Sequence, residues 1–198
     1  MQASVSNSKR LKPGLKERVR LLLGIGKYDR RAEYLIYRSI ELYHKGGKIN
    51  TNRAIRLYNK IRRKYTCNIW PGVQVGEGMY IAHAHDVCIG KTAIIGDNCS
   101  FYPHSDITAA VKDDAERNRS KERRHAKIGN DCMIGNGAVI VGPVTVGNDV
   151  TIGAGALVTK DVPSHTVVKG LNGFRPKRPE EIPEKYYRDG VLIGEEEE

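Results

Sequence analysis

Histidine stands at two places in the 198-residue chain where it could do chemistry. The segment MYIAHAHDVCIG, residues 79 to 90, carries His83 and His85 one residue apart, and the segment RRHAKI carries His125 after Arg124. An imidazole can move protons near neutral pH or bind a metal ion. It can also simply fill space in a core. The elements that position these side chains decide among the three uses.

The part of the chain after residue 69 repeats an apolar residue every six positions. The position after each apolar residue is commonly Gly or Ala, and the fifth position of each six is commonly small. A unit of six residues cannot bury its single aliphatic side chain alone, so the units must stack as a solenoid around a continuous core. The repeated positions are Ile69, Val75, Ile81, Ile89, Ile95, Phe101, Ile107, Ile128, Ile134, Ile140, Val146, Ile152 and Val158.

One long insertion interrupts the repeat, at residues 108–127, which read TAAVKDDAERNRSKERRHAK. Its charge density predicts an exposed excursion loop, and loops of this length in a compact repeat are usually functional or disordered. Arg124 and His125 end the insertion just before the repeat resumes, which favours a functional loop.

The four cysteines are Cys67, Cys88, Cys99 and Cys132. Their spacing fits neither a metal-binding motif nor a disulfide framework, and two of them occupy small-residue positions of the repeat. We therefore expect them to be reduced and structural.

Residues 1–65 have helical rather than sixfold spacing. Asp29 is a candidate cap for the second predicted helix, Gly46-Gly47 is its expected stop, and Asn50 or Thr51 is the expected start of the third. The three apolar stripes are Leu15, Val19, Leu22 and Leu23; Ala32, Leu35, Ile36, Ile40 and Tyr43; and Ala54, Leu57, Tyr58, Ile61 and Tyr65.

The basic character of the chain belongs to this helical region. Residues 1–64 carry 18 Lys and Arg against 4 Asp and Glu, within a whole-chain net charge of +10. Nucleic acid, an anionic membrane surface or an acidic saccharide could each be attracted, and charge alone does not choose. We expect a solvated cationic face over buried tyrosines, with no nucleic-acid partner.

The sequence also suggests where the protein is located and how its domains are divided. No apolar run is long enough to span a membrane and no secretory leader is evident, so the expected location is the cytoplasm. Residues 66–172 are expected to form the repeat domain, and the proline-rich, charged residues 173–198 a strap or free tail.

The repeat resembles the hexapeptide-repeat acyltransferases. Within that family, GMYIAHAHDVCIGKTAII (residues 78–95), RHAKI (124–128) and DVPSHTVVKG (161–170) resemble, in order, three segments of serine acetyltransferase and related saccharide O-acetyltransferases. The resemblance implies a mainly β chain folded as a left-handed parallel β-helix of a little over four turns, with a short helical N-terminal region. It also implies a homotrimer.

The resemblance further implies acetyl transfer from acetyl-CoA to a hydroxyl group, with no permanently bound cofactor. His83 would act as general base on the acceptor hydroxyl. His125 would lie across a groove between protomers and hold the acceptor or the oxyanion, and Arg124 would bind an anionic group of the acceptor. His85, His104 and His165 are expected to be structural.

The chain departs from this family on the acceptor side. Asn68 stands where an aspartate supports the base, with Asp86 as a possible substitute, and Ala82 replaces an aspartate that grips the serine amino group. We therefore favour a sugar hydroxyl of a surface polysaccharide precursor as acceptor, reached by a basic layer suited to an anionic glycan carrier or membrane surface. Serine is the alternative.

The family resemblance places the pantetheine arm of CoA along the later turns. The residues implied are Gly135, Gly153, Ala154, Lys160, Lys169 and Gly170, with Arg175 and Lys177 as weaker candidates for the CoA phosphates.

Two other classes remain open. A carbonic-anhydrase-like protein would bind zinc through histidines such as His83, His104 and His125. The close histidine pair it requires around one turn is not evident, so no metal site is expected. A non-catalytic trimeric scaffold would instead use its basic helices to bind nucleic acid or lipid.

Overall fold

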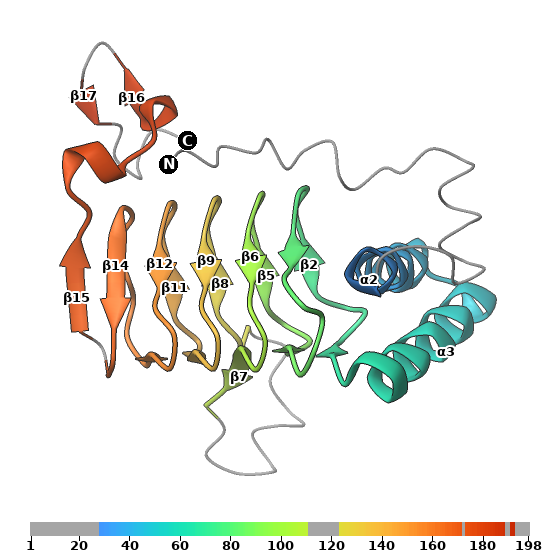
Figure 1. Cartoon of the computed structure of the whole chain (residues 1–198). Coiled ribbons are helices and arrows are strands. Elements are labelled where there is room, and N and C mark those ends of the chain that lie inside the picture. Colours follow the sequence, from blue (N-terminus) through green and yellow to red (C-terminus); the bar gives the residue numbers. More distant parts are fainter. Residues whose placement is uncertain (1–27, 111–122, 172, 189–190, 193–198) are drawn as a thin grey trace.

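The protein is a parallel β-helix closed at one end by two helices (Figure 1). The computed structural model describes residues 28–110, 123–171, 173–188 and 191–192. The predicted helix around Leu15 to Leu23 lies outside these residues.

Three parallel sheets form the three faces of the coil, and the chain visits them in rotation. The first face consists of β1 (Asn68–Ile69), β4 (Cys88–Ile89), β7 (Asp106–Ala109), β10 (Val139–Gly142) and β13 (Leu157–Val158). The second consists of β2 (Gln74–Val75), β5 (Ile94–Ile95), β8 (Lys127–Ile128) and β11 (Thr145–Val146). The third consists of β3 (Tyr80–Ile81), β6 (Ser100–Phe101), β9 (Met133–Ile134), β12 (Thr151–Ile152) and β14 (Thr166–Lys169).

Two of the three edges between these faces carry the candidate site residues. The loop edge, between the first and second faces, contains the described residues 70–73, 90–93, 110, 123–126, 143–144 and 159–161. The histidine edge, between the third and first faces, contains residues 82–87, 102–105, 135–138, 153–156 and 170.

The predicted apolar positions line the core. All of them lie in the strands, and all are buried except Val75, which is half-buried. Ile81, Phe101 and Ile134 are paired in register on successive turns, and each is fully buried. The repeat prediction is therefore confirmed.

The coil is longer than the sequence pattern indicated. Val162 forms a parallel bridge with Val146, and Val168 is buried in β14 above Ile152. These two positions complete a fifth turn. The pattern missed them because Val162 follows Val158 after only four residues, which breaks the sixfold spacing.

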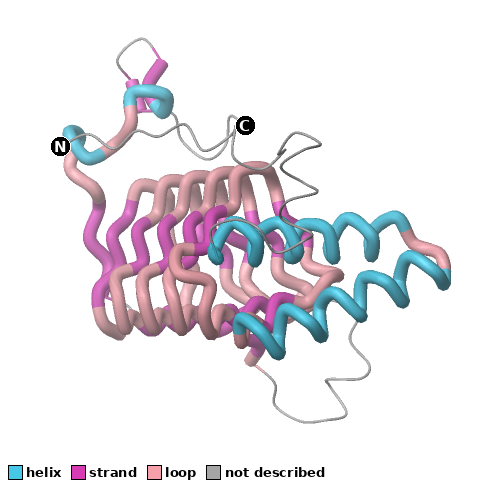
Figure 2. The backbone as a smooth tube through the Cα atoms, turned by 45° about the vertical axis from the view of Figure 1, so that its right-hand side comes forward, coloured by secondary structure: helices cyan, strands magenta, loops and turns pink. Residues whose placement is uncertain are grey.

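The helices α2 (Tyr28–Lys45) and α3 (Lys48–Tyr65) lie side by side at the start of the coil (Figure 2). They meet at Gly46 and Gly47, whose φ values of 66° and 77° are readily adopted by glycine. Two predicted boundaries were wrong: α2 begins before Asp29, which therefore does not cap it, and α3 begins at Lys48 rather than at Asn50 or Thr51. Neither described helix is long and apolar enough to cross a membrane.

Helix α2 covers the open edge of the first turn. The Ile81 N–H donates to Glu33 Oε1 at 3.0 Å, and the Tyr37 hydroxyl accepts from the Met79 N–H at 3.0 Å. These N–H groups belong to the first turn, so no preceding turn can pair with them, and left unpaired they could form a sheet with another chain. The helical region thus caps the first turn of the solenoid.

The excursion loop is shorter than predicted. Thr108 and Ala109 pair with Val141 and Gly142 on the next turn, and Lys127 lies in β8. The predicted range 108–127 is therefore too long at both ends, because strand pairing includes Thr108, Ala109 and Lys127.

The described part of the C-terminal segment is a strap fastened to the coil. The strand β15 (Gly173–Pro176) pairs antiparallel with β14, and the 3-10 helices Pro179–Glu181 and Glu184–Tyr186 follow. The strands β16 (Tyr187–Arg188) and β17 (Val191–Leu192) form a small hairpin. Tyr186 packs its ring at 4.8 Å from that of His165.

Candidate active site

His83 stands exposed on the histidine edge. Its φ of 48° lies in the left-handed region, and its neighbours Ala82 and Ala84 are buried. Because the two alanines anchor the turn inward, the imidazole between them is turned out to solvent. Among the described residues the His83 ring has no hydrogen-bond partner, which leaves both nitrogens available to a ligand.

Asn68, the predicted orienting residue, is held by other groups. Its Oδ1 accepts from the Tyr58 hydroxyl at 2.5 Å, and its Nδ2–H donates to Cys88 Sγ at 3.6 Å. Tyr58 comes from α3, so the helical region reaches the first turn here. Within the described chain no hydrogen bond joins Asn68 to His83, and its role in orienting the base stays a prediction.

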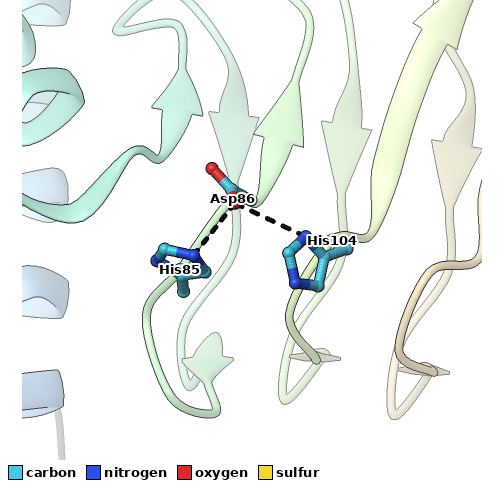
Figure 3. Close-up of side chains that lie close together, drawn as sticks. All are labelled: His85, Asp86 and His104. Atoms are coloured by element: carbon cyan, nitrogen blue, oxygen red, sulfur yellow. Dashed lines mark ion pairs between the residues drawn. The ribbon is translucent and has the colours of Figure 1, made fainter.

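Asp86, the predicted substitute for the missing carboxylate, faces two other histidines (Figure 3). Its Oδ2 lies 3.0 Å from His85 Nε2 and 3.5 Å from His104 Nδ1, and the two rings are 5.5 Å apart. The sequence expectation that no close histidine pair exists around one turn was wrong. The expectation that His165 is structural fits its burial and its 3.1 Å contact with Asp149.

His125 lies on the loop edge, with its ring fixed by Thr92. The Nδ1 atom lies 2.7 Å from the Thr92 hydroxyl and accepts from the Thr92 backbone N–H at 3.3 Å. Since a backbone N–H can only donate, Nδ1 must be unprotonated, and the proton of the neutral ring is on Nε2. His125 therefore presents an N–H donor, which suits an oxyanion better than it suits a general base.

The pKa of His125 favours the same neutral form. Burial lowers it below the ordinary 6.5 of histidine, and the positive charge of Arg124 lowers it further.

This shift should make the folded protein sensitive to acid. Because the folded pKa is depressed, the unfolded chain binds this proton first, so stability present above 6.5 is lost as the pH falls toward the folded pKa. Between about pH 7.5 and 5.5 we expect the urea midpoint of His125→Asn to fall less than that of the unaltered protein. Circular dichroism would measure both midpoints. Equal falls would contradict a buried neutral ring.

Gly90 makes room for the His125 ring. A Cβ placed on Gly90 would lie 1.8 Å from His125 Nε2 and 2.0 Å from Cδ2. No side chain fits there without displacing the imidazole. Gly90 and Thr92 were missed as site residues, although both belong to the quoted segment that carries the family resemblance.

Arg124 has a partly unsatisfied guanidinium. Its Nε and Nη1 are buried, and the described residues offer them no hydrogen-bond partner. The neighbouring Arg123, in contrast, donates to the carbonyls of His125 and Val144 at 2.8 and 3.0 Å. A buried charge without a partner is costly, so Arg124 is prepared for an anionic ligand.

The two catalytic candidates lie on different edges of one chain. His83, Ala82 and Asp86 are on the histidine edge, whereas Arg124 and His125 are on the loop edge. A single copy does not bring these groups together. They can meet only where the histidine edge of one copy faces the loop edge of another.

The residues implied for CoA divide in the same way. Gly135, Gly153, Ala154 and Gly170 lie on the histidine edge, Lys160 lies on the loop edge, and Lys169 ends β14. Packing alone also explains why residue 135 is glycine, because a Cβ there would lie 2.7 Å from the Ala154 nitrogen.

The weaker phosphate candidates are engaged elsewhere. Lys177 Nζ lies 2.6 Å from Asp149 Oδ1, and Arg175 Nη1 lies 2.9 Å from Glu181 Oε2. The coil matches the charge of Lys177 and the strap itself matches that of Arg175, which argues against the predicted use of either residue for the CoA phosphates.

A basic pocket of about 600 Å³ opens between α3 and the first turn. It adjoins the histidine edge, since the Thr66 hydroxyl in its lining contacts His85 Nδ1 at 3.1 Å. The sequence showed that α3 is basic, but it did not show that several of its arginines line one cavity. The lining residues are Arg56, Asn59, Arg62, Arg63, Thr66 and Asn68.

Comparison with known proteins defines the class. The sequence profile described as "Bacterial transferase hexapeptide (six repeats)" matches residues 125–160. Together with the fold, this match defines the class of the structure as a left-handed β-helix of hexapeptide repeats, similar to those of the hexapeptide-repeat transferases.

Within that class the chain is similar to serine acetyltransferases. It is 41% identical over 117 residues to a probable serine acetyltransferase of Oryza sativa, covering 59% of this chain and 36% of that protein. It is 34% identical over 136 residues to a serine acetyltransferase of Staphylococcus epidermidis, covering 68% and 61%. A soybean serine acetyltransferase solved with serine aligns with a TM-score of 0.64 and 29% identity, covering 75% and 57%.

The chain spans between 33% and 61% of the length of the curated relatives it matches.

Proposed function

We propose that the protein transfers an acetyl group from acetyl-CoA to the hydroxyl of a small carboxylate acceptor, with serine as the first candidate. The similarity to serine acetyltransferases supports the reaction and favours serine over the sugar acceptor preferred from sequence. The observation that carries the choice of acceptor is the buried guanidinium of Arg124, two of whose nitrogens have no partner among the described residues.

The proposed mechanism uses both edges. His83 takes the proton of the acceptor hydroxyl as its oxygen attacks the thioester carbon. The Nε2–H of His125 donates to the oxyanion that forms, and Arg124 binds the acceptor carboxylate. The intermediate then breaks its carbon–sulfur bond, and His83 returns the proton to the CoA thiolate. The products are the O-acetyl ester and free CoA.

This mechanism requires more than one copy of the chain. His83 and His125 lie on different edges, so we propose that a homotrimer pairs the histidine edge of each copy with the loop edge of the next. The CoA arm would then follow Gly135, Gly153 and Ala154 along the histidine edge, with Lys160 of the facing loop edge and Lys169 near the phosphates.

An acidic sugar is the second candidate acceptor. Ala82 is buried with no carboxylate to offer an amino group, and the basic pocket beside the histidine edge could hold an acidic or phosphorylated saccharide. Both acceptors share an anionic group and a hydroxyl. They differ in whether the protein must also bind an ammonium group.

An acceptor panel tests the proposal. Free thiol released from acetyl-CoA would be measured with serine, serinamide and a set of neutral and acidic sugars. If Arg124 binds the acceptor carboxylate, Arg124→Met should lower kcat/KM for serine about tenfold to a hundredfold. The same variant should leave the low activity on serinamide unchanged, because serinamide has no carboxylate.

The control for this experiment is Arg124→Lys, which keeps the positive charge and should retain part of the activity on serine. Activity on sugars alone would reject serine as acceptor. Equal losses on serine and serinamide would remove Arg124 from carboxylate binding.

A further inference from the structure

We propose that His85, Asp86 and His104 form a binding site for a first-row divalent metal ion of the zinc type (Figure 3). Two imidazoles and one carboxylate are a ligand set that Zn²⁺ accepts. The proposal does not depend on the acetyl-transfer reaction, and it replaces the sequence expectation that the chain has no metal site.

The three ligand atoms are already close together. Asp86 Oδ2 lies 3.0 Å from His85 Nε2 and 3.5 Å from His104 Nδ1, and all three atoms lie within 4.8 Å of one another. Ligands of a tetrahedral zinc ion, each bound at about 2.1 Å, are roughly 3.4 Å apart. Small side-chain rotations would therefore bring the group to coordinating distance.

Thr66 fixes the proton of His85 on the nitrogen that does not face the carboxylate. The Thr66 hydroxyl donates its only proton to the Tyr65 carbonyl at 2.6 Å, and its oxygen accepts from the Asp86 N–H at 3.1 Å. The remaining contact, 3.1 Å to His85 Nδ1, must therefore be donated by the ring. A partner that holds the second ring N–H in this way is typical of metal-ligating histidines.

This tautomer of neutral His85 directs a nitrogen lone pair at the carboxylate of Asp86. With its proton on Nδ1, neutral His85 turns the Nε2 lone pair toward Asp86 Oδ2 at 3.0 Å. That contact is repulsive unless a positive species lies between the two atoms. A bound cation would satisfy His85, Asp86 and His104 at once, whereas one proton would serve only a single nitrogen.

The backbone holds these ligands on successive turns of the coil. Thr66, Asp86 and His104 each precede a stacked strand of the first face by two residues, and all three have φ between 49° and 59°. The His104 N–H also donates to the His85 carbonyl at 3.3 Å. Ligands on a stacked, hydrogen-bonded backbone need little reorganisation to bind an ion.

The site is open to solvent on one side. The side chains of His85, Asp86 and His104 are 55%, 41% and 55% exposed. An ion could therefore enter directly and keep a water molecule as its fourth ligand. Bound there, it would join the corner of residues 82–87, which also carries His83, to the corner of residues 102–105 on the next turn.

Metal titration of the full chain tests the proposal. Protein stripped with a chelator would be titrated with ZnCl₂ by calorimetry and with CoCl₂ by visible absorption. We expect one Zn²⁺ per chain and the intense visible bands of four-coordinate Co²⁺. His85→Ala and His104→Ala should each weaken Zn²⁺ binding at least tenfold, and Thr66→Val should weaken it about tenfold through the lost ring partner.

Two histidine controls separate this site from its neighbours. His83→Ala removes the exposed imidazole on the same edge, and His44→Gln removes a ring on α2 that contacts the Val73 carbonyl at 3.0 Å. Both should bind Zn²⁺ with unchanged affinity. Circular dichroism without metal would verify that every variant is folded.

Binding below one ion per chain, or binding unaffected by the His85 and His104 substitutions, would overturn the proposal. Loss of Zn²⁺ in His83→Ala would also overturn it, because the ion would then belong to the proposed catalytic imidazole.

Discussion

Replacing His83 by alanine is expected to reduce acetyl transfer at least a hundredfold while the protein stays folded. The ring is exposed and has no hydrogen-bond partner among the described residues, so its removal breaks no contact of the coil. A positioned general base commonly contributes a factor of about 10² to 10⁴ in rate. The release of CoA thiol would be followed at saturating acetyl-CoA, together with the thermal midpoint.

A second histidine substitution provides the control for this prediction. His44→Gln changes an exposed ring on α2 that contacts the Val73 carbonyl at the first corner of the loop edge. Because this contact involves neither His83 nor His125, the variant should keep full activity. Activity in His83→Ala within a few-fold of the unaltered protein would remove His83 from the reaction. A large fall in its thermal midpoint would instead assign it a structural role.

A single methyl group at Gly90 is expected to lower acetyl transfer about as much as removal of His125, roughly 10² to 10³ fold. The Cβ of Gly90→Ala would lie 1.8 Å from His125 Nε2, so the ring must leave its position over the turn. It would then lose the Thr92 contacts that keep its proton on Nε2. Initial rates of thiol release would measure the loss.

The double variant distinguishes displacement of the ring from general damage. With His125 already replaced by alanine, the three atoms nearest to the new Cβ are gone. The effects of Gly90→Ala and His125→Ala should therefore be strongly non-additive, with the double variant no worse than His125→Ala alone. Additive losses would show that Gly90 acts through the backbone rather than through His125.

The sequence was sufficient for the fold because a sixfold repeat has one way to bury its apolar residues. Each unit offers one aliphatic side chain, such as Ile89 or Ile134, and only stacked turns cover it. The errors in the predicted coil length and loop bounds arose where the chain departs from this regular spacing. The short step from Val158 to Val162 hid the fifth turn, and the pairing of Ala109 with Gly142 shortened the loop.

The sequence also determined which histidines deserved attention but not which of them meet. Tyr80 stacks on Ser100, 20 residues later, whereas Cys88 stacks on Asp106, only 18 later. The two extra residues of the corner between them change the register. The contact of His85 with His104, 19 positions apart, therefore could not be read from the repeat.

By itself, the sequence determined the solenoid and the chemical types present at the site, because these depend on periodicity and composition. The tertiary structure alone decided that Thr92 fixes the tautomer of His125, that Gly90 accommodates its ring, and that His83 and His125 lie on separate edges. The physical reason is that contacts across turns depend on corner lengths and on the excursion loop, and neither follows from the spacing of apolar residues.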